Sequence, residues 1–337
     1  MRRPYGGELI NMINKRAFFN AAGDFDTSGA GFQYAINTMS QIRAEIIKQI
    51  FFEISIADYL PVDVGFAAWK SEIVQNLEFL SVGRFADGIV NQGNSRRPKV
   101  DAGISQIRMP IKTWAVKTTW TIAEIAEAAS AGNWDVVESK LRALKKDWDL
   151  GIQETAFNGL TGDDEITGLL TNANVNINTT LITEDVSGMS DAEFQTFVKG
   201  LLTAYYANSN STRLPTKLIM PTADYLGMAT AASATFPNIS KIEYLENSLK
   251  KMTANDGFKI LPLTYAQSDK NPAAKDRYVL YRDDPETLKL TIPVDMTMKQ
   301  AYTINDFDFE QLAYGQFSGV LIGRPREVLY FDKTATT

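Results

Sequence analysis

Apolar residues recur every three or four positions in several stretches of the chain, which is the spacing of one helix face. The pattern predicts a helix over 34–52, and a short Ala-rich helix from the capping box at 121–124 to about Ala131. A long helix, capped by Asn133, is predicted over 134–158. One face of this helix carries a narrow stripe of mostly apolar residues: Val137, Leu141, Leu144, Trp148, Ile152 and Thr155. A stripe this narrow predicts a helix that lies across a surface rather than inside a core.

The second half of the chain predicts a compact mixture of helices and strands. Ser190 and Ser240 each stand three residues before a glutamate, so two further helices are expected to begin there. Short apolar runs between turn residues predict strands. These runs are 216–221, 258–265, 277–282 and 287–293, with two more over 300–309 and 317–331 that give a β-rich C-terminal region.

The region 64–116 is predicted to form a long two-stranded hairpin with strands over 69–80 and 104–116. In the second strand Ile107, Met109 and Ile111 alternate with Arg108 and Lys112, which is the period of a half-buried strand. An isolated two-stranded hairpin is only marginally stable in water, and this one has little of its own to pack on. We therefore expect another molecule to cover its apolar faces.

Charge is unevenly distributed along the chain. From Arg84 to Lys117 there are seven basic and two acidic residues, a net +5, so the remainder must carry −11 to give the overall −6. A basic protrusion on an acidic body favours docking onto another copy of the chain, and a solvated loop or a contact with nucleic acid is the alternative. The Gly-rich residues 1–33 are predicted to be an arm that packs on something, because they carry several aromatic residues.

Composition narrows the chemistry available to the protein. The 337 residues include neither cysteine nor histidine, which excludes disulfides, thiolate nucleophiles, Cys/His zinc sites and histidine-dependent triads. With 45% hydrophobic and 22% charged residues, the composition is typical of a globular protein. No apolar run reaches the length of a membrane span, so no membrane association is expected.

The candidate carboxylate clusters each have a simpler interpretation. Asp306, Asp308 and Glu310 share one strand face and could hold a divalent cation, but a solvent-facing surface opposite two phenylalanines is favoured. The run 163–165 is predicted to be a solvated loop, and 283–285 a turn. No catalytic, cofactor-binding or metal-binding residue is assigned, and no enzymatic activity is expected.

Several segments carry a resemblance to a known family by their order along the chain. They are "YLPVDVG", "RRPKVD", "TIAEIAEAASAGNWDVVESKLRALKKDWDLGIQETAFNG", "EITGLLTNANV", "LPTKLIMPTADYLGMAT", "RYVLYRDDPETLKLTIP" and "SGVLIGRPREVLYFD". Over about residues 30–332 the chain resembles the major capsid proteins of tailed bacteriophages, which have the HK97-like fold. Within them it is similar to a phage and prophage branch formerly described as a domain of unknown function. One departure is Thr171, which precedes the asparagine of the "GLL" motif.

The resemblance implies an α+β, HK97-like capsid fold. The expected parts are an N-terminal arm (1–33), a helix and linker of the peripheral domain (34–63), an extended hairpin or E-loop (64–116), a peripheral domain (117–175) with a spine helix (134–158), an axial α/β domain (176–300), and C-terminal strands (301–337). The "ITGLL" segment after the spine helix would then be an apolar linker that seats this helix against the axial domain.

The resemblance also implies a shell function. Copies of the chain would form hexamers and pentamers of an icosahedral virion head that encloses double-stranded DNA and is assembled in the host cytoplasm. The portal protein, scaffold proteins and decoration proteins are the further expected partners. Contacts between subunits are expected at Phe18, Phe19, Phe25, Arg84, Arg96, Arg97, Lys99, Ile107, Arg108, Met109 and Ile111.

Two alternatives remain open from the sequence. An encapsulin-like nanocompartment shell would share the fold, and neighbouring genes for a terminase and portal, or for a cargo enzyme, would distinguish the two. A carboxylate-based, metal-dependent hydrolase would instead use residues such as Asp306, Asp308 and Glu310.

Overall fold

The computed structural model describes residues 52–81, 101–130, 135–230, 239–305 and 307–334. The arm predicted over 1–33 and nearly all of the helix predicted over 34–52 lie outside these residues. The chain divides into two compact units. The first unit includes, among the described residues, 52, 116–130, 135–146, 298–305 and 307–313. The second unit comprises Glu53–Ala115, Asp147–Thr297 and Tyr314–Thr337.

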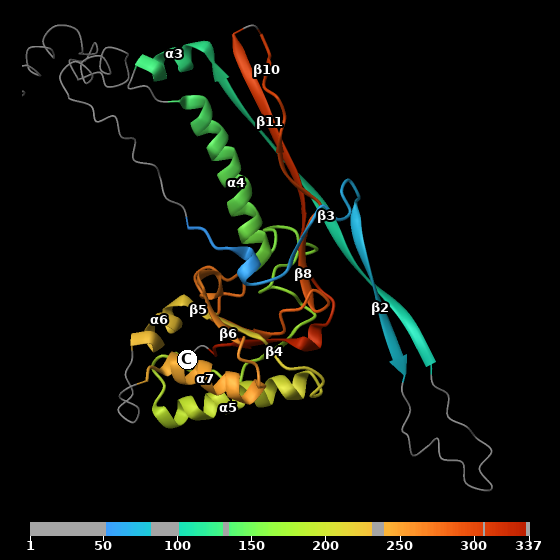
Figure 1. Ribbon diagram of the computed structural model, residues 1–337, viewed down its shortest axis with the longest axis vertical. Coiled ribbons are helices and arrows are strands. Elements are labelled where there is room, and N and C mark those ends of the chain that lie inside the picture. Colours follow the sequence, from blue (N-terminus) through green and yellow to red (C-terminus); the bar gives the residue numbers. More distant parts are fainter. Residues whose placement is uncertain (1–51, 82–100, 131–134, 231–238, 306, 335–337) are drawn as a thin grey trace, which may run out of the picture. The chain divides into compact units, whose positions relative to one another are not determined.

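A five-stranded sheet organises the second unit (Figure 1). Its strands are, in spatial order, β4 (Asn176–Asn178), β13 (Val328–Asp332), β7 (Arg277–Tyr281), β5 (Lys217–Pro221) and β6 (Lys259–Leu263). The pairs β4–β13 and β5–β6 are parallel, whereas β7 runs antiparallel to both of its neighbours. Every residue of β5, β7 and β13 is buried, which explains why their sequences are nearly continuous apolar runs.

The two faces of this sheet border two different hydrophobic cores. Side chains alternate along a strand, so in β7 Tyr278 and Leu280 join one core, while Val279 and Tyr281 join the other. The first of these cores includes buried residues of the helices α5 (Asp191–Asn208), α6 (Thr222–Thr230) and α7 (Lys241–Thr253). The second includes the C-terminal end of the long helix α4 (Val136–Asn158).

Capping residues define the starts of α5 and α7. Ser190 forms the predicted capping box with Glu193, and Ser240 accepts a hydrogen bond from the Glu243 nitrogen. The apolar face of α5 is buried as predicted: Phe194, Phe197, Val198, Leu201, Leu202 and Tyr205. Both helix starts are therefore confirmed, because the capping signal is local in sequence.

The "ITGLL" segment is buried in the same core as the end of α4. Gly159, with φ +82°, ends the helix, and the chain then turns back along it. The nitrogens of Leu169 and Leu170 donate to the carbonyl oxygens of Ala156 and Phe157, at 2.9 and 2.8 Å. These two backbone hydrogen bonds and the apolar side chains fix the segment on the last turn of the helix.

The predicted hairpin is confirmed as an antiparallel ribbon of β2 (Glu72–Ser81) and β3 (Asp101–Thr121), which pair from Glu72 opposite Pro110 to Ser81 opposite Asp101. The return strand was expected to end at Val116, and it continues to Thr121 because it also pairs with a later strand. The sheet order is β10 (Tyr302–Thr303), β11 (Asp308–Ser318), β3 and β2, with β9 (Val294–Met298) on β11.

The remaining short elements complete the second unit. A three-stranded sheet has the order β1 (Val62–Val64), β8 (Leu288–Ile292) and β12 (Val320–Ile322). The 3-10 helices are η1 (Ile56–Asp58), η3 (Thr264–Ala266) and η4 (Pro325–Glu327). None of the helices in the described residues combines the length and apolar character that crossing a bilayer requires.

The predicted start of helix α3 (Ile122–Ser130) is confirmed, whereas the predicted start of α4 is wrong. The helix α3 begins at the predicted capping box, in which Glu124 N donates to Thr121 Oγ1 at 3.1 Å. The prediction that α4 starts at Trp134 is wrong, because it starts at Val136, where the Asp135 carboxylate accepts from Glu138 N at 2.9 Å. Its last turns are also core rather than surface, since Ala156 and Phe157 are fully buried.

Candidate functional site

One face of the β2–β3 ribbon leaves apolar side chains exposed to solvent. Residues directly opposite in an antiparallel pair share a face, so Val74, Leu80 and Ile104 lie on the same side of the ribbon. They are 41%, 64% and 75% exposed, respectively. Glu72 and Arg108 also lie on this face and form an exposed ion pair of 3.6 Å. Large exposed apolar side chains next to charged ones are typical of a protein–protein contact surface.

The opposite face of the ribbon is covered at its base by the protein itself. Ile73 and Met109 are each 5% exposed and form a small core with Leu321, against which Ile107 and Ile111 pack in part. The expectation that the ribbon has little of its own to pack on is therefore wrong at this end. Met109 belongs to internal packing. Of the contact residues expected on this strand, the partly buried Ile107 and Ile111 and the exposed Arg108 stay available for an outside contact.

A constrained loop before the ribbon presents two further aromatic residues. Ala67 and Trp69 both have positive φ, at 61° and 60°, which is unusual for residues with side chains. Trp69 N donates to the buried Gln316 Oε1 at 2.8 Å, which fixes this conformation. Phe66 and Trp69 are nevertheless 54% and 64% exposed. Strained backbone that is held by specific hydrogen bonds is often found at functional positions.

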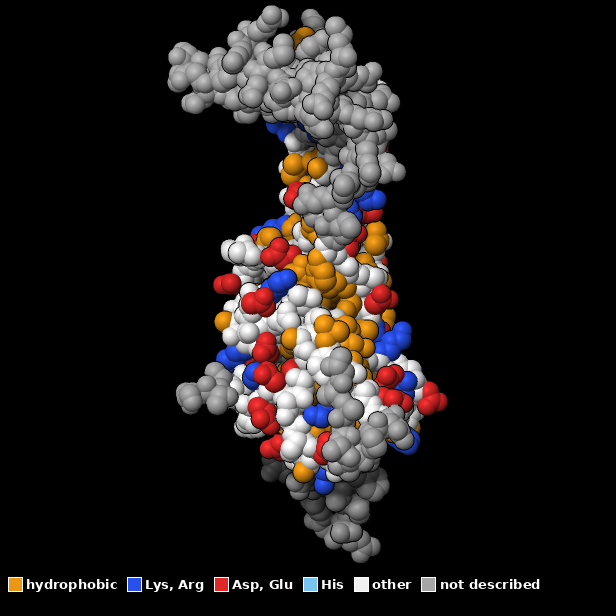
Figure 2. Space-filling view, turned by 90° about the vertical axis from the view of Figure 1, so that its left-hand side faces the viewer, with side chains coloured by type: hydrophobic (Ala, Val, Ile, Leu, Met, Phe, Trp, Pro, Cys, Tyr) orange, Lys and Arg blue, Asp and Glu red, His pale blue; other side chains and the backbone are white. Residues whose placement is uncertain are grey.

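Exposed apolar side chains gather on other parts of the described surface as well. Figure 2 shows one face on which hydrophobic side chains form a patch between scattered acidic and basic ones. In the first unit, Ile122 and Ile125 of α3 are 47% and 40% exposed. Near the β10–β11 turn the exposed apolar residues are Tyr302, Ile304 and Phe307. The contact candidates are therefore more numerous than the sequence indicated.

Most of the contact residues named from the sequence lie outside the described residues. These are Phe18, Phe19 and Phe25 of the predicted arm, and Arg84, Arg96, Arg97 and Lys99 of the predicted hairpin tip. Their roles stay predictions. The sequence analysis did not identify Phe66, Trp69, Leu80 and Ile104 as contact residues. A signal existed for Leu80 and Ile104, because both are apolar residues in a predicted hairpin strand.

The acidic loop after α4 was expected to be solvated, but one of its carboxylates forms an ion pair. Lys112 Nζ lies 2.6 Å from Asp163 Oδ2, so the return strand of the ribbon is joined to this loop. The hydrogen bond from Lys112 lowers the pKa of Asp163, and the same hydrogen bond raises the pKa of Lys112. One of the basic residues of the +5 segment is thus neutralised within the protein's own second unit.

Two of the three carboxylates predicted to share a strand face, Asp308 and Glu310, are described, and each has a hydrogen-bond partner. Asp306 lies outside the described residues, and Asp308 Oδ2 accepts from Asn305 Nδ2 at 2.9 Å. The solvent-facing interpretation is wrong for Glu310, which is 8% exposed and accepts from Tyr302 Oη at 2.6 Å and Lys117 Nζ at 2.9 Å. Among the described residues no group of three acidic side chains is placed to hold a metal ion.

Glu310 should show a measurable pH signature. The hydrogen bond from Tyr302, followed by that from Lys117, lowers its pKa below the ordinary value. Because the folded-state pKa is depressed, ionised Glu310 stabilises the first unit above about pH 4.3 and this contribution is lost as pH falls through the depressed value. We expect Tyr302→Phe to raise the Glu310 pKa, as measured by NMR titration of its carboxyl carbon. An unchanged pKa in that variant would contradict the assigned hydrogen bond.

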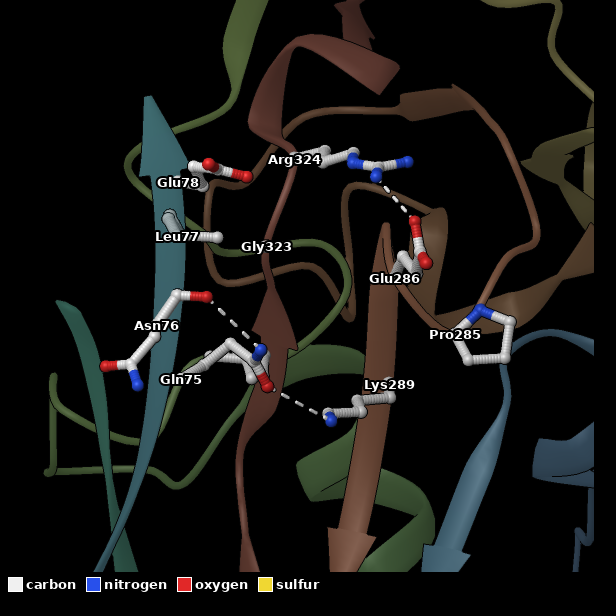
Figure 3. A pocket seen from close by; sticks show the side chains of 10 residues that line it. Gln75, Asn76, Leu77, Glu78, Pro285, Glu286, Lys289, Gly323 and Arg324 are labelled. Atoms are coloured by element: carbon white, nitrogen blue, oxygen red, sulfur yellow. Dashed lines mark hydrogen bonds and ion pairs between the residues drawn. The ribbon is translucent and has the colours of Figure 1, made fainter. Parts of the chain in front are cut away.

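A cavity in the second unit is lined by several charged and polar groups that already have partners. It has a volume of about 520 Å³ and lies between β2 and the loops around β8 and β12 (Figure 3). The Arg324 guanidinium pairs with Glu286 across one end, and Lys289 Nζ donates to Gln75 Oε1 at 3.4 Å at the other. The cavity brings together no nucleophile with a base, and we assign it no chemistry.

The buried tyrosines are structural rather than reactive. Burial raises the pKa of Tyr59 to about 12 and raises the pKa values of Tyr205, Tyr278, Tyr281 and Tyr330 further. Tyr59 Oη donates to the Pro262 carbonyl oxygen and Tyr330 Oη to that of Leu169, both at 2.6 Å. These hydroxyls stay protonated and satisfy buried backbone groups.

Comparison with known proteins places the chain in a family. The family described as "Major capsid protein" matches residues 86–333. The fold is similar to that of the capsid of Myoviridae phage XM1, with 15% identity, a TM-score of 0.73, and coverage of 88% of this chain and 98% of that one. The comparison with curated proteins found no match.

Two further capsids share the fold. One is the capsid of a native GTA particle, with 11% identity, a TM-score of 0.59, and coverage of 93% and 99% of the two chains. The other is the capsid of cyanophage P-SCSP1u, with 12% identity, a TM-score of 0.52, and coverage of 95% and 100%. The mixed helix and sheet architecture is thus the HK97-like one. The chain belongs to the family of major capsid proteins.

Proposed function

We propose that copies of this chain assemble into hexamers and pentamers of an icosahedral head that encloses double-stranded DNA. The observation that carries the proposal is the face of the β2–β3 ribbon on which Val74, Leu80 and Ile104 are exposed among polar residues, in a chain of the major capsid protein family. Burial of the exposed side chains of Val74, Leu80 and Ile104 is favourable in free energy, and an adjacent copy of the same chain buries them. The ribbon is then the E-loop, α4 the spine helix, and the five-stranded sheet with its helices the axial domain.

Charge supports contact between copies rather than with DNA. The segment from Arg84 to Lys117 carries +5 against −11 on the remainder, so copies attract through unlike surfaces. A net charge of −6 per copy limits adhesion of packaged DNA to the shell, since phosphate binding needs clustered cations. In this proposal the shell acts as a non-enzymatic container in the virion, formed in the host cytoplasm, with a portal protein and with scaffold and decoration proteins as partners.

Two charge substitutions test the ribbon face. We expect Leu80→Lys or Ile104→Lys to reduce shell yield by about tenfold or more, because a lysine buried without a partner at an interface costs over 1.4 kcal/mol. Shells are counted by negative-stain microscopy after sedimentation of purified protein. The melting temperature of the unassembled chain should stay unchanged, since both side chains are exposed in it.

Met252→Lys is the matched control, because Met252 is 50% exposed on α7, away from the ribbon strands. It should assemble like the unmodified chain. Normal shells from both ribbon variants would refute the ribbon contact. An unmodified chain that stays a monodisperse monomer at high concentration would refute the shell function itself.

A further inference from the structure

A second cavity in the second unit lies against α4 and is lined by aromatic side chains; we call it the α4 cavity. It has a volume of about 240 Å³, and Trp114, Trp148 and Phe317 belong to its wall. The ring centroids of Trp114 and Trp148 are 5.3 Å apart, and the rings are tilted by 56° rather than stacked, so they do not fully cover each other's faces. Tryptophan is the aromatic residue whose ring face attracts cations most strongly. The wall of this cavity therefore suits a ligand that is both apolar and positively charged.

Packing from behind holds the Trp148 ring in place. A Cβ at Gly315 of β11 would fall against this ring, so the strand and the indole are in close contact. Phe317 meets the same ring edge-on, with 6.2 Å between centroids, and Trp148 is only 5% exposed. A side chain that is already fixed loses little conformational freedom when a ligand binds, so this part of the wall is preorganised.

The charged residues that line the cavity are both acidic. Asp147 and Glu154 contribute to the lining from α4. Both are exposed, and neither has a hydrogen-bond or ion-pair partner within the described part of the chain. Earlier in the same helix the situation differs, because Glu138 forms an i,i+4 ion pair with Arg142. The cavity therefore has a negative potential that its own lining does not neutralise, and this potential attracts cations.

The spacing of the two carboxylates decides which kind of cation fits. Seven residues are about two turns, so Asp147 and Glu154 lie about 20° apart around the helix and about 10.5 Å apart along it. Gly151 lies between them, and a Cβ there would meet no atom within 4 Å. One metal ion cannot bind both groups, because the oxygen ligands of Mg²⁺ or Ca²⁺ lie within about 2.0–2.6 Å of the ion. The spacing instead suits an elongated ligand with a positive charge near each end.

Linear aliphatic polyamines have this form. Spermidine has nine bonds between its terminal nitrogens, and bonds of about 1.5 Å each advance about 1.2–1.3 Å in an extended chain, so it spans about 11 Å. Its methylene groups match the aromatic wall and the bare helix surface at Gly151. The cavity is also smaller than the roughly 300–1,000 Å³ of most small-molecule sites, which favours a thin chain over a ligand with rings.

We propose that the α4 cavity binds a linear aliphatic polyamine. One terminal ammonium group pairs with Asp147 and the other with Glu154, while the chain passes over Gly151 and contacts the rings of Trp114 and Trp148. The ion pairs set the length of the ligand, and the ring contacts add cation–π attraction and apolar burial. This inference goes beyond the proposed function and does not depend on it, because every residue involved belongs to the second unit of one chain.

A series of amines of different length tests the proposed spacing. Isothermal titration calorimetry of the purified full-length chain measures the Kd of spermidine, 1,8-diaminooctane and putrescine. 1,8-Diaminooctane has the same nine bonds between terminal nitrogens as spermidine but no central amine, whereas putrescine has five bonds and spans about 6 Å. We expect both longer amines to bind about tenfold more tightly than putrescine, because only they reach both carboxylates.

Substitutions in the cavity test which residues hold the ligand. Asp147→Asn combined with Glu154→Gln keeps the side-chain sizes and should weaken spermidine binding by about tenfold. Glu184→Gln combined with Asp256→Asn is the matched control, because it removes the same charge from exposed residues outside the cavity. Gly151→Leu should abolish binding without lowering the melting temperature, since leucine is the better helix former and meets no atom at its Cβ.

NMR of the indole N–H groups locates the ligand. The resonances of Trp114 and Trp148 should shift when spermidine is added, and they should not shift in Gly151→Leu. Equal affinity for putrescine and 1,8-diaminooctane would overturn the proposal, as would an equal loss of affinity in the control variant or shifts confined to the other tryptophans. A chain that forms shells but binds no polyamine would refute this proposal alone. A chain that binds spermidine as described but forms no shells would refute the proposed function alone.

Discussion

Replacing Gly168 with alanine is expected to lower the free energy of unfolding by about 3 kcal/mol, at the upper end of overpacking effects. Gly168 lies in the "ITGLL" segment, where the chain returns along the last turn of α4. A Cβ there would fall against the Phe157 carbonyl group and 2.5 Å from the Gly159 nitrogen. These are backbone atoms of a buried turn and cannot rotate away, so the two segments must separate. Urea denaturation monitored by tryptophan fluorescence measures the loss.

Gly188→Ala is the matched control for this substitution. Its Cβ would have only an ordinary contact, 3.4 Å from the Asp185 carbonyl oxygen, so stability should change by less than about 1 kcal/mol. If Gly168→Ala unfolded at the same urea concentration as the control, the close approach of the two segments would be incorrect.

Asp332→Ala is expected to destabilise the second unit by about 3–5 kcal/mol, because it leaves a buried guanidinium without its counter-charge. The Arg277 and Asp332 side chains are 6% and 4% exposed, and Nε and Nη2 of the arginine donate to the two carboxylate oxygens at 2.6 and 2.7 Å. Arg277 also donates to the Leu170 carbonyl oxygen and lies 4.7 Å over the Tyr330 ring. Chemical denaturation again gives the measurement.

A double-mutant cycle separates the ion pair from simple loss of packing. Arg277→Met combined with Asp332→Leu should cost less than the sum of the single changes, since no charge stays buried alone. The exposed i,i+4 pair of Glu246 and Lys250 on α7 is the comparison, and Glu246→Ala should cost under about 0.5 kcal/mol. Strict additivity in the cycle would show that the buried pair is not coupled.

Local signals in the sequence predicted local structure well. The capping boxes at Thr121 and Ser190 and the alternation around Met109 each act over a few residues, and each is present in the structure. The start of α4 was misplaced because "GNWD" offers two capping residues, Asn133 and Asp135. Only the contact from Glu138 N to Asp135 distinguishes them.

Features that depend on distant partners could not be predicted. The extension of β3 to Thr121 depends on β11, and the buried Glu310 pairs with Lys117, which lies 193 residues away in sequence. A small cavity beside α4 could not be predicted for the same reason, since Trp114, Trp148 and Phe317, which line it, meet only in the fold. A signal for it did exist, because Gly151 interrupts an otherwise strong helix pattern.

The position of β13 in the five-stranded sheet affects how the protein can be made. This strand, 328–332, is the last one in the described sequence, yet it lies between β4 and β7 and carries Asp332. Until it arrives, β4 has no neighbour in this sheet and Arg277 has no counter-ion. A nascent chain on the ribosome therefore cannot complete this sheet before residues 328–332 have left the exit tunnel. A chain that stops before β13 leaves strand edges of this sheet unpaired, and unpaired edges favour aggregation.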